Sequence, residues 1–373
     1  MCEVLRHSDT LLVPSAFHKG FKEFGICPEG IPSAEFFLSP AKFILFEMDR
    51  NLRKIIVSRT DRIGDVVLSL PVFASLKKWF PDCQTIALVS NYASDVVRSS
   101  PYVDDVVTCG ADESVMTVYK KLKNAGADAI VLLFPRFKIA AASFFAGIPV
   151  RVGTAYRWYS FLFNKKVHEH RKNSIKNEAE YNLTLIEALG CEEKAFDITL
   201  LIDDIASNSV NTFLGQNCLT RFVIVHPGSG GSAYEWGPDN FREVVKSIAN
   251  TFSLNVVVTG TNSERPLCKK ISEGIGNAIN TAGRFSTLEF IALLSRADLF
   301  ISNSTGPLHI AAAVGAPVIG LYPNNKPMTP VRWAPITDKK IILVPKDGSD
   351  NVSLISVEEV LESVRKLVPG EPR

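Results

Sequence analysis

The sequence predicts an α/β protein with two Rossmann-like doubly wound parallel sheets that face each other across a cleft. Three observations carry this prediction. Strand-like and helix-like segments alternate from Lys54 onward, the alternation pauses near residues 195–207 and then restarts, and 373 residues with 46% apolar residues exceed the usual size of one domain. We expect an N-terminal extension at residues 1–52, a first domain at 53–200 and a second domain at 201–373.

In the first half, the strands are nearly continuous apolar runs, which is typical of parallel strands buried on both faces. We expect them at residues 54–58, 85–89, 103–107 and 129–134. Helical segments follow the strands: one amphipathic helix through Val66, Leu70, Phe73 and Lys77, then segments through 96–97, 119–122 and 140–145. A long helix near 177–189, which stops at Gly190, closes this half.

The second half repeats the pattern of the first. Strands are expected at residues 222–226, 256–260, 299–302 and 318–322, each followed by a helical stretch, and a last helix spans 357–367. Ligands of such proteins bind beyond the carboxyl ends of the strands, so the cleft between the halves is the expected ligand site.

Composition excludes several classes of protein. The formal net charge is only +2, whereas a dedicated nucleic-acid-binding protein normally has a strongly basic domain, so no nucleic-acid partner is expected. Seven cysteines are scattered and form no C-x-x-C pair, as in reduced cytosolic proteins. We find no signal-peptide pattern and no apolar run that approaches the roughly 20 residues of a membrane span. We therefore expect a soluble cytoplasmic protein, or one peripheral to a membrane.

A charged loop joins the first strand to the first helix. It contains Arg62, Ile63, Gly64 and Asp65. Asp65 would face the cleft because it follows the carboxyl end of a parallel strand. The alternative is that Asp65 only caps the following helix, and spacing alone favours that alternative.

A second junction follows the third strand of the second half. Ser304 or Thr305 can cap the helix expected over residues 310–314, and Gly306 lets a ligand approach the backbone. Free amide groups and the positive end of a helix dipole form an anion site, to which His309 can add a donor. A diphosphate fits such a site. From this segment alone, a well-capped helix with an incidental histidine is at least as good an interpretation.

A Gly/Ser-rich loop follows the first strand of the second half. The spacing Gly228-x-Gly230-x-x-Ala233 meets the dinucleotide-binding pattern, but the next helix begins only at Pro238 and the following strand carries no acidic residue at its tip. Either a loop that touches phosphates or a plain surface loop explains this segment. Glu264, after the next strand, can cap a helix or bind a ribose hydroxyl.

Positive charge is concentrated in residues 136–176, which we call the basic aromatic segment. Nine basic residues stand there against the single acidic Glu169: Arg136, Lys138, Arg151, Arg157, Lys165, Lys166, Arg171, Lys172 and Lys176. Aromatic residues are interleaved: Phe144, Phe145, Tyr156, Trp158, Tyr159, Phe161 and Phe163. The combination suits an anionic amphiphile or a membrane face, although charge runs are most often ordinary solvated surfaces.

Several signatures of other enzymes are absent from the sequence. It contains no P-loop, no G-x-S-x-G elbow, no H-E-x-x-H motif and no D-x-D that would hold a divalent metal on a nucleotide diphosphate. We expect neither a metal nor another cofactor.

The order of motifs resembles a known family. The matching pieces are Arg62-Ile63-Gly64-Asp65 with Leu70-Pro71, Phe80-Pro81-Asp82, Pro101-Tyr102-Val103-Asp104, His226-Pro227-Gly228 with Trp236, Gly260 with Glu264, and Ser304-Thr305-Gly306-Pro307-Leu308-His309 with Ala311-Ala312 and Pro317. With these pieces, residues 53–330 resemble the heptosyltransferases of glycosyltransferase family 9. That family has the two-domain GT-B fold and adds ADP-activated heptose to the inner core of lipopolysaccharide.

The resemblance implies roles for particular residues. Asp65 matches the family's general base, which favours catalysis over capping. The implied donor-binding residues are Gly228, Ser229, Gly230, Tyr234, Glu264, Ser304, Thr305, Gly306 and His309. Among them, the turn from Gly306 to His309 would hold the diphosphate and Glu264 the ribose. The expected acceptor-binding residues are Arg62, Arg136, Arg157 and Lys165.

Two residues depart from the family pattern. Ser304 stands where the family has an aspartate associated with the donor sugar, and Tyr234 where it has a lysine that neutralises the donor phosphates.

The implied function is inverting, metal-independent transfer of heptose or a related sugar from a nucleotide diphosphate, such as ADP-heptose, to an anionic glycan or glycolipid such as the lipopolysaccharide core. Such an enzyme would work in the cytoplasm, with peripheral contact to the inner membrane.

Two other functions stay open. One is a catalytically silent relative that binds nucleotide sugar or glycan, which the two departures suggest. The other is a nicotinamide-dependent oxidoreductase, which rests on the Gly228-x-Gly230-x-x-Ala233 spacing alone. We rank it below the glycosyltransferase and below the silent relative.

Overall fold

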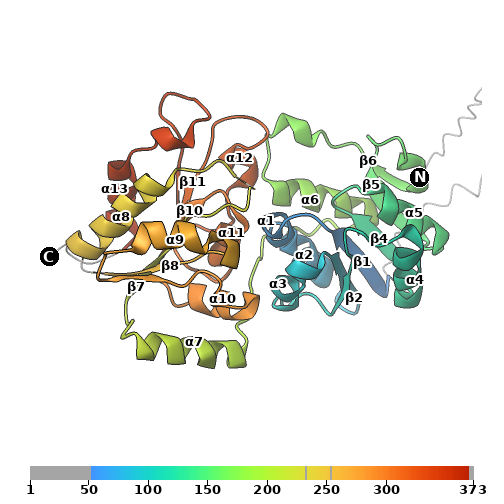
Figure 1. Cartoon of the computed structure of the whole chain (residues 1–373). Coiled ribbons are helices and arrows are strands. Elements are labelled where there is room, and N and C mark those ends of the chain that lie inside the picture. The colour runs from blue at the N-terminus through green and yellow to red at the C-terminus, as the bar shows by residue number, and fades with distance from the viewer. Residues whose placement is uncertain (1–51, 232, 253, 369–373) are drawn as a thin grey trace, which may run out of the picture. The chain divides into compact units, whose positions relative to one another are not determined.

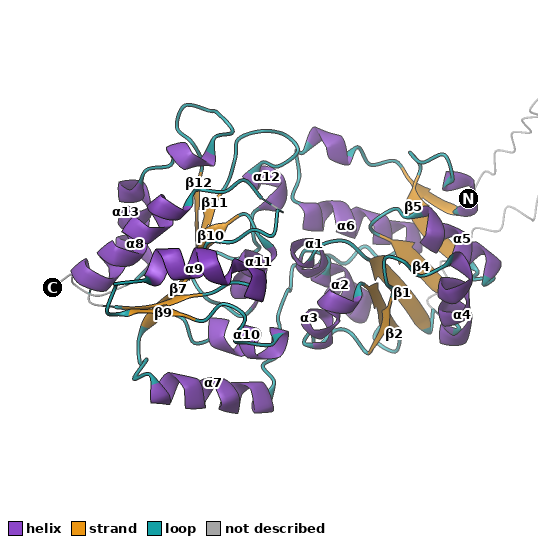
Figure 2. Cartoon of the chain, viewed as in Figure 1, coloured by secondary structure: helices purple, strands orange, loops and turns teal. Residues whose placement is uncertain are grey.

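The computed structural model describes residues 52–231, 233–252 and 254–368, so the expected extension lies outside the described residues except for Leu52. Within these residues the chain forms two six-stranded parallel sheets with helices around them (Figures 1 and 2). The predicted α/β architecture with two doubly wound sheets is therefore confirmed. The described residues all belong to one compact unit. The predicted division at residues 200 and 201 stays a prediction.

The first sheet has the strand order β3-β2-β1-β4-β5-β6. Its strands are β1 (Lys54–Arg59), β2 (Gln84–Val89), β3 (Asp105–Thr108), β4 (Ala129–Leu132), β5 (Val150–Thr154) and β6 (Lys165–Val167). The helices of this half are α1 (Ile63–Val67), α2 (Leu70–Trp79), α3 (Ser94–Arg98), α4 (Val115–Ala125), α5 (Phe137–Phe145) and α6 (Glu178–Ile186). The central strand β1 pairs with β2 and β4 and buries its side chains from Ile55 to Arg59.

The second sheet has the order β12-β11-β10-β7-β8-β9, which repeats the topology of the first. Its strands are β7 (Phe222–His226), β8 (Asn255–Val258), β9 (Ala278–Asn280), β10 (Leu299–Asn303), β11 (Val318–Leu321) and β12 (Lys340–Leu343). The helices are α7 (Asp204–Gln216), α8 (Pro238–Thr251), α9 (Arg265–Ser272), α10 (Thr287–Leu294), α11 (Gly306–Ala313), α12 (Pro330–Trp333) and α13 (Val357–Leu367). The last helix spans the residues that the sequence predicts.

The prediction of a single helix from Val66 to Lys77 is wrong. The chain forms two helices there, α1 and α2, with a break at Leu68 and Ser69. The Ser69 hydroxyl donates to the Val66 carbonyl at 2.6 Å, which satisfies an acceptor at the end of α1. Pro71 lies in the first turn of α2, where its missing N–H costs nothing. The break lets α1 turn independently of α2, and α1 carries Asp65.

The helix expected near residues 177–189 is present in two parts. Asn177 caps α6 and exchanges hydrogen bonds with Glu180 as a capping box. A 3₁₀ turn from Glu187 to Leu189 follows, and Gly190 ends it with a φ of +80°. This places Glu178 in the first turn of α6.

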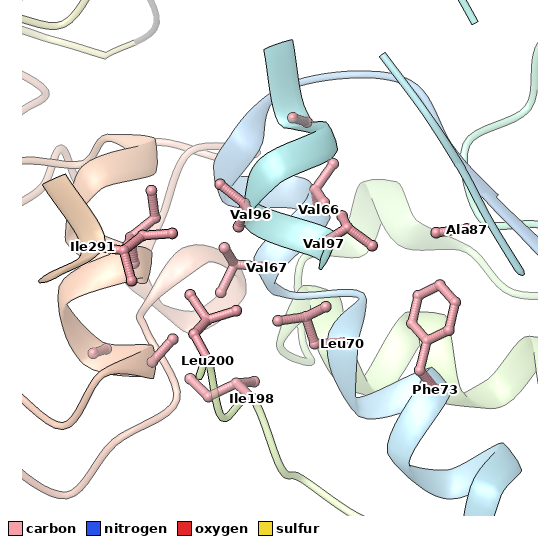
Figure 3. Packing of buried hydrophobic residues seen from close by; sticks show 14 of the residues in the cluster. Val66, Val67, Leu70, Phe73, Ala87, Val96, Val97, Ile198, Leu200 and Ile291 are labelled. Atoms are coloured by element: carbon pink, nitrogen blue, oxygen red, sulfur yellow. The ribbon is translucent and has the colours of Figure 1, made fainter. Parts of the chain in front are cut away.

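The apolar core continues from one half into the other. Val67 of α1, Leu70 of α2, Leu200 of the connecting segment and Ile291 of α10 belong to one buried cluster, and Figure 3 shows these side chains together. Burying each such side chain contributes about 1.5–3 kcal/mol, so this contact stabilises the arrangement of both sheets around the cleft.

Among the described residues, no helix has both the length and the apolar character required to cross a bilayer.

Candidate functional site

A cleft of about 1010 Å³ lies between the two halves, at the carboxyl ends of both sheets. Its volume is at the upper end of the range for small-molecule sites. The first half lines it from Thr60 to Asp65 and with Phe134, and the second half lines it with loops that follow β7, β8 and β10. The cleft stands where the sequence predicts the ligand site.

Most of the predicted site residues line this cleft. The predicted residues that it brings together are Arg62, Asp65, Arg136, Gly228, Ser229, Gly230, Glu264, Ser304, Thr305, Gly306 and His309. Three predicted residues are not part of the lining: Arg157, Lys165 and Tyr234. Tyr234 is 43% exposed, and its hydroxyl accepts a hydrogen bond from Nδ2 of Asn325 at 3.0 Å.

Asp65 is the third residue of α1, and Arg62 occupies the N-cap position. The interpretation of Asp65 as a helix cap is therefore wrong. The Asp65 side chain is only 15% exposed and its Oδ1 accepts a hydrogen bond from Nη2 of Arg59 at 2.5 Å. Burial raises the pKa of Asp65 to about 6, although Arg59 acts in the opposite direction. A carboxylate with this pKa is ionised at neutral pH and still basic enough to accept a proton.

Arg59 ends β1 and is buried beneath the cleft. Its guanidinium donates to Asp61 Oδ1 at 2.8 Å, to Glu178 Oε1 at 2.8 Å and to Asn182 Oδ1 at 3.2 Å, besides Asp65. Burial alone would lower the pKa of Arg59, but the surrounding carboxylates raise it, so the guanidinium stays charged. Nothing in the local sequence pattern indicates Glu178 as a partner of Arg59, from which it is 119 positions away.

The helix α11 begins at Gly306, four residues earlier than expected, because Pro307 is accommodated in its first turn. Thr305 is the N-cap residue and its side chain makes no capping hydrogen bond. In the first turn of α11, Pro307 has no N–H and the Leu308 amide donates to the Thr305 carbonyl at 3.2 Å, so this end of the helix offers the Gly306 amide and partial positive charge to the cleft.

His309 lies in the first turn of α11 and is 4% exposed. Its Nδ1 atom is buried and has no hydrogen-bond partner. Burial lowers the pKa of His309 to about 4, so the imidazole is neutral at physiological pH. A buried polar atom without a hydrogen-bond partner costs stability, and the residue as a whole borders the cleft.

The loop after β7 contains the Gly228-x-Gly230-x-x-Ala233 spacing but leads into α8 only at Pro238. The dinucleotide-binding geometry, in which a helix opens within this pattern, is therefore not formed. Gly228 instead lies against Glu264: a Cβ atom on Gly228 would be 2.0 Å from Glu264 Oε1. A side chain at this position would require the Glu264 carboxylate to move.

Glu264 has the capping role that the sequence allows. Its Oε2 atom accepts hydrogen bonds from the amide and hydroxyl of Thr261 at 2.7 and 2.8 Å, so the capping role is confirmed. Its Oε1 atom accepts from the Gly230 amide at 3.2 Å. Burial raises the pKa of Glu264, but these hydrogen bonds and the neighbouring His226 hold it below its ordinary value. The carboxylate is ionised and borders the cleft; its role toward a ribose stays a prediction.

The basic aromatic segment is divided between structural and surface residues. Arg136 lines the cleft with its guanidinium 4.7 Å from the centre of the Phe134 ring. Arg151 donates to the carbonyls of Ile148 at 2.5 Å and Leu162 at 2.8 Å, and so holds the local fold. Large apolar side chains remain exposed: Phe137 (44%), Phe144 (45%), Phe145 (67%), Tyr156 (47%), Trp158 (73%) and Phe161 (67%).

The segment around α12 also lines the cleft, through Met328 and Trp333. Arg332, between them, donates to Glu178 Oε2 from Nε at 2.9 Å and from Nη2 at 2.8 Å. These residues are not predicted from the sequence, because no motif marks a pair 154 positions apart.

Among the residues that the structure describes, no group of three or more His, Cys, Asp or Glu side chains is arranged to hold a metal ion.

Comparison with known proteins identifies the family. The model of glycosyltransferase family 9 (heptosyltransferase) matches residues 115–354, which is more than half of the chain. A Haemophilus influenzae protein with only a provisional name as a glycosyltransferase is 30% identical over 334 residues, 84% of this chain and 96% of that protein. Lipopolysaccharide heptosyltransferase 3 of Escherichia coli is 24% identical over 340 residues, 83% and 96% of the two chains.

The fold is likewise similar to a solved structure of this family. The E. coli ADP-heptose lipopolysaccharide heptosyltransferase II superposes with a TM-score of 0.73 at 19% identity, over 85% of this chain and 98% of that chain. The fold is thus the GT-B arrangement that the resemblance implies. Together with the cleft that unites Asp65 and the start of α11, these matches show that the chain is a glycosyltransferase and belongs to family 9, the heptosyltransferase family.

Proposed function

We propose that the protein is an inverting, metal-independent glycosyltransferase that moves heptose or a related sugar from a nucleotide diphosphate donor to an anionic glycan acceptor. The observation that carries the proposal is the shared cleft, which is lined by Asp65 from one half and by the α11 entrance from the other. The E. coli relatives are named as lipopolysaccharide heptosyltransferases, and one of them as ADP-heptose-dependent. ADP-heptose is therefore the first candidate for the donor, and the lipopolysaccharide core is the first candidate for the acceptor.

Asp65 is the proposed general base. An acceptor hydroxyl oxygen forms a bond to the anomeric carbon on the face opposite the leaving group, and Asp65 takes the hydroxyl proton. The bond between the anomeric carbon and the phosphate oxygen breaks, and the departing nucleoside diphosphate keeps the electron pair. A pKa of about 6 leaves Asp65 deprotonated for this step at neutral pH.

The α11 entrance is the proposed site of the donor diphosphate. The Gly306 amide and the imidazole of His309 can donate to phosphate oxygens, and the helix dipole favours the negative charge that builds up on the leaving group. One such preorganised donor is worth about 2.7–4 kcal/mol in other enzymes. These groups would take the part that a divalent cation plays elsewhere. We therefore expect undiminished transfer in EDTA.

The acceptor is proposed to approach from the first half. Arg62 and Arg136 line the cleft there, and the exposed basic aromatic segment extends over the surface of the same half. Snorkelling basic side chains beside exposed aromatic rings suit a membrane interface that presents an anionic glycolipid. We propose peripheral contact with such a membrane on its cytoplasmic face.

A catalytically silent relative is the second candidate, and the position of Tyr234 outside the cleft lining favours it. Without a lysine there, the donor phosphates would lack that positive charge, and uncharged Ser304 stands at the cleft wall where the family has the aspartate associated with the donor sugar. Incubation of the purified protein with a panel of nucleotide sugars and a lipid-linked core acceptor separates the two. Release of nucleoside diphosphate only when acceptor is present supports transfer, and donor binding without release supports the silent relative.

The base assignment is tested with Asp65→Asn and Asp65→Ala. Both variants should fold and bind donor normally, whereas turnover falls by orders of magnitude, because general-base catalysis typically contributes about 10²–10⁴-fold. Asp112→Asn, which neutralises an exposed carboxylate of the same half, is the matched control and should keep full activity. Near-normal transfer by Asp65→Asn would reject the assignment.

A further inference from the structure

A buried carboxylate that has no part in the proposed reaction holds three arginines. Glu178 is the first residue of α6 and is fully buried. Its Oε1 accepts from Nη1 of Arg59 at 2.8 Å and from Nη1 of Arg171 at 2.6 Å, while its Oε2 accepts from Arg332 at 2.9 and 2.8 Å. Burial raises the pKa of Glu178, but the three guanidiniums hold it at about 2. Glu178 is therefore a permanent negative charge.

Arg59 connects this carboxylate to the proposed base. The guanidinium that donates Nη1 to Glu178 donates Nη2 to Asp65 and Nε to Asp61. Because a guanidinium is planar and its donors point in fixed directions, anchoring one edge on Glu178 sets the direction of the donor that Asp65 receives. Glu178 thus governs the position of Asp65 without touching it.

Arg332 comes from the other half of the protein. It lies on α12, next to the cleft-lining Trp333, and it also donates Nη1 to the Arg171 carbonyl at 3.3 Å. A second contact joins the same elements, from Nδ2 of Asn177 to the Ala334 carbonyl at 3.0 Å. The chain of hydrogen bonds therefore runs from α12 through Glu178 and Arg59 to Asp65.

We propose that Glu178 is a positioning residue for Asp65 that acts through Arg59, and that Arg332 makes this arrangement depend on the contact between α12 and α6. The proposal rests on the proposed function, in which Asp65 accepts the acceptor proton. Opening of the cleft at α12 removes Arg332 from Glu178 and leaves Arg59 less firmly directed. The base is then fully oriented only while the two halves are in contact.

The charges of the cluster explain why Arg332 should matter to Asp65. Three carboxylates (Asp61, Asp65 and Glu178) meet three guanidiniums (Arg59, Arg171 and Arg332). Other ionisable groups near the Asp65 loop are Arg62, Tyr92, Arg136 and the neutral His309. Without Arg332 the cluster carries one net negative charge, which disfavours ionisation of Asp65.

The test compares Arg332→Gln, Arg332→Lys and the matched control Arg365→Gln. Arg365 also pairs with a glutamate, Glu358 at 2.9 Å, but on α13. We expect Arg332→Gln to lower kcat by roughly 10- to 100-fold, the scale that misplacement of a reacting group produces, with little change in donor KM. The acid limb of the pH profile should move to higher pH. Arg332→Lys should restore much of both, and Arg365→Gln should match the wild type.

A second measurement separates this proposal from the proposed function. The ¹³C NMR titration of the Asp65 carboxyl, assigned by its loss in Asp65→Asn, requires no turnover. An upward shift of that titration in Arg332→Gln, but not in Arg365→Gln, supports the relay even if no sugar is transferred. Folded variants in which both the titration and the pH profile match the wild type would overturn it, whatever their thermal stability.

Discussion

Gly64 and His309 touch across the cleft: a Cβ atom on Gly64 would lie 2.9 Å from Cδ2 of His309. The contact is reciprocated at Gly306, where a Cβ atom would lie 3.2 Å from Cβ of Ile63 and 3.3 Å from the Gly64 amide nitrogen. Two glycines from different halves thus let α1 and α11 approach as backbones. The residue after Gly64 is Asp65, so this contact holds the proposed base beside the proposed phosphate site.

Gly64→Ala should impair transfer by pushing α1 away from α11. A Cβ contact below 3.0 Å cannot be accommodated unless His309 or the helix shifts, and His309 is buried. We expect kcat/KM to fall roughly 10- to 100-fold, in keeping with the cost of misplacing reacting groups by about 1 Å.

Gly215→Ala is the matched control for this substitution. Gly215 lies in α7, and a Cβ atom there would meet nothing within 4 Å. The control should keep full activity and gain about 0.4–1 kcal/mol of stability. Steady-state kinetics and thermal unfolding of both variants check the prediction, and equal activity of Gly64→Ala and wild type would contradict the contact's importance.

The rate of transfer should fall as the pH drops below about 6, because Asp65 must be deprotonated to accept a proton. The predicted profile of kcat/KM loses about tenfold per pH unit below that value. A limb near pH 4, the ordinary range of an aspartate, would show that burial does not set the pKa of Asp65.

The contribution of Asp65 to folding stability should depend on pH in the opposite direction to the transfer rate. The pKa of Asp65 is higher in the folded protein than the ordinary value of 3.8, so the folded state binds this proton more tightly than the unfolded chain does. The contribution of Asp65 to stability is therefore most favourable below pH 3.8 and is lost as the pH rises through about 6. Asp65→Asn should raise the Tm relative to the wild type above pH 6, and the difference should vanish at pH 3–4.

His309→Ala should weaken binding of a nucleoside diphosphate by roughly tenfold, the worth of one hydrogen bond to a charged group. The pKa of His309 is about 4, so its imidazole is neutral and contributes as a dipole. The affinity for ADP, measured by calorimetry, should therefore have the same pH dependence near pH 6.5 in the wild type and in His309→Ala. His168→Ala, at an exposed position, is the control. A binding transition near pH 6.5 that disappears only in His309→Ala would contradict a neutral imidazole.

The sequence predicts the sheets well where the strands are buried on both faces. β1 and β7 are continuous apolar runs, and their positions differ from the prediction by at most one residue. The sequence does not predict β5, whose apolar residues are interrupted by Arg151 and Gly153, or β6, β9 and β12, which have only three or four residues; none of the four is fully buried. A short edge or near-edge strand has neither a long apolar run nor a clear alternation, so its existence depends on the neighbouring strand.

The site residues likewise fall into those that the local sequence predicts and those that it does not. The motif loops that hold Asp65, Gly228, Glu264 and His309 are predicted, because turn residues and glycines mark them locally. The partners of Arg59 are not, because Glu178 is 119 positions away and an ion pair leaves no periodic trace. The interpretation of Asp65 as a cap is wrong for a related reason. Helix α1 begins at Ile63, two residues before Asp65, and includes Gly64, where α11 leaves no room for a side chain. This contact with a distant segment cannot be read from the local sequence.

The exposed aromatic residues of the first half lead to a prediction about membranes. Trp158 is 73% and Phe161 67% exposed, and basic side chains of the same segment surround them in sequence. We expect the wild type to sediment with vesicles that contain anionic lipid and less with purely zwitterionic vesicles, since basic residues add about 1 kcal/mol each near an anionic surface.

The double substitution Trp158→Ala with Phe161→Ala should reduce sedimentation with anionic vesicles, because the apolar contribution to interfacial binding scales with the aromatic area that is inserted. Ile205→Ala is the matched control, since Ile205 on α7 is 81% exposed but lies outside the basic aromatic segment. Transfer to a short, water-soluble acceptor should be unaffected in all three proteins. Equal sedimentation of the double variant and the wild type would show that this surface does not contact the membrane and that the acceptor reaches the cleft by another path.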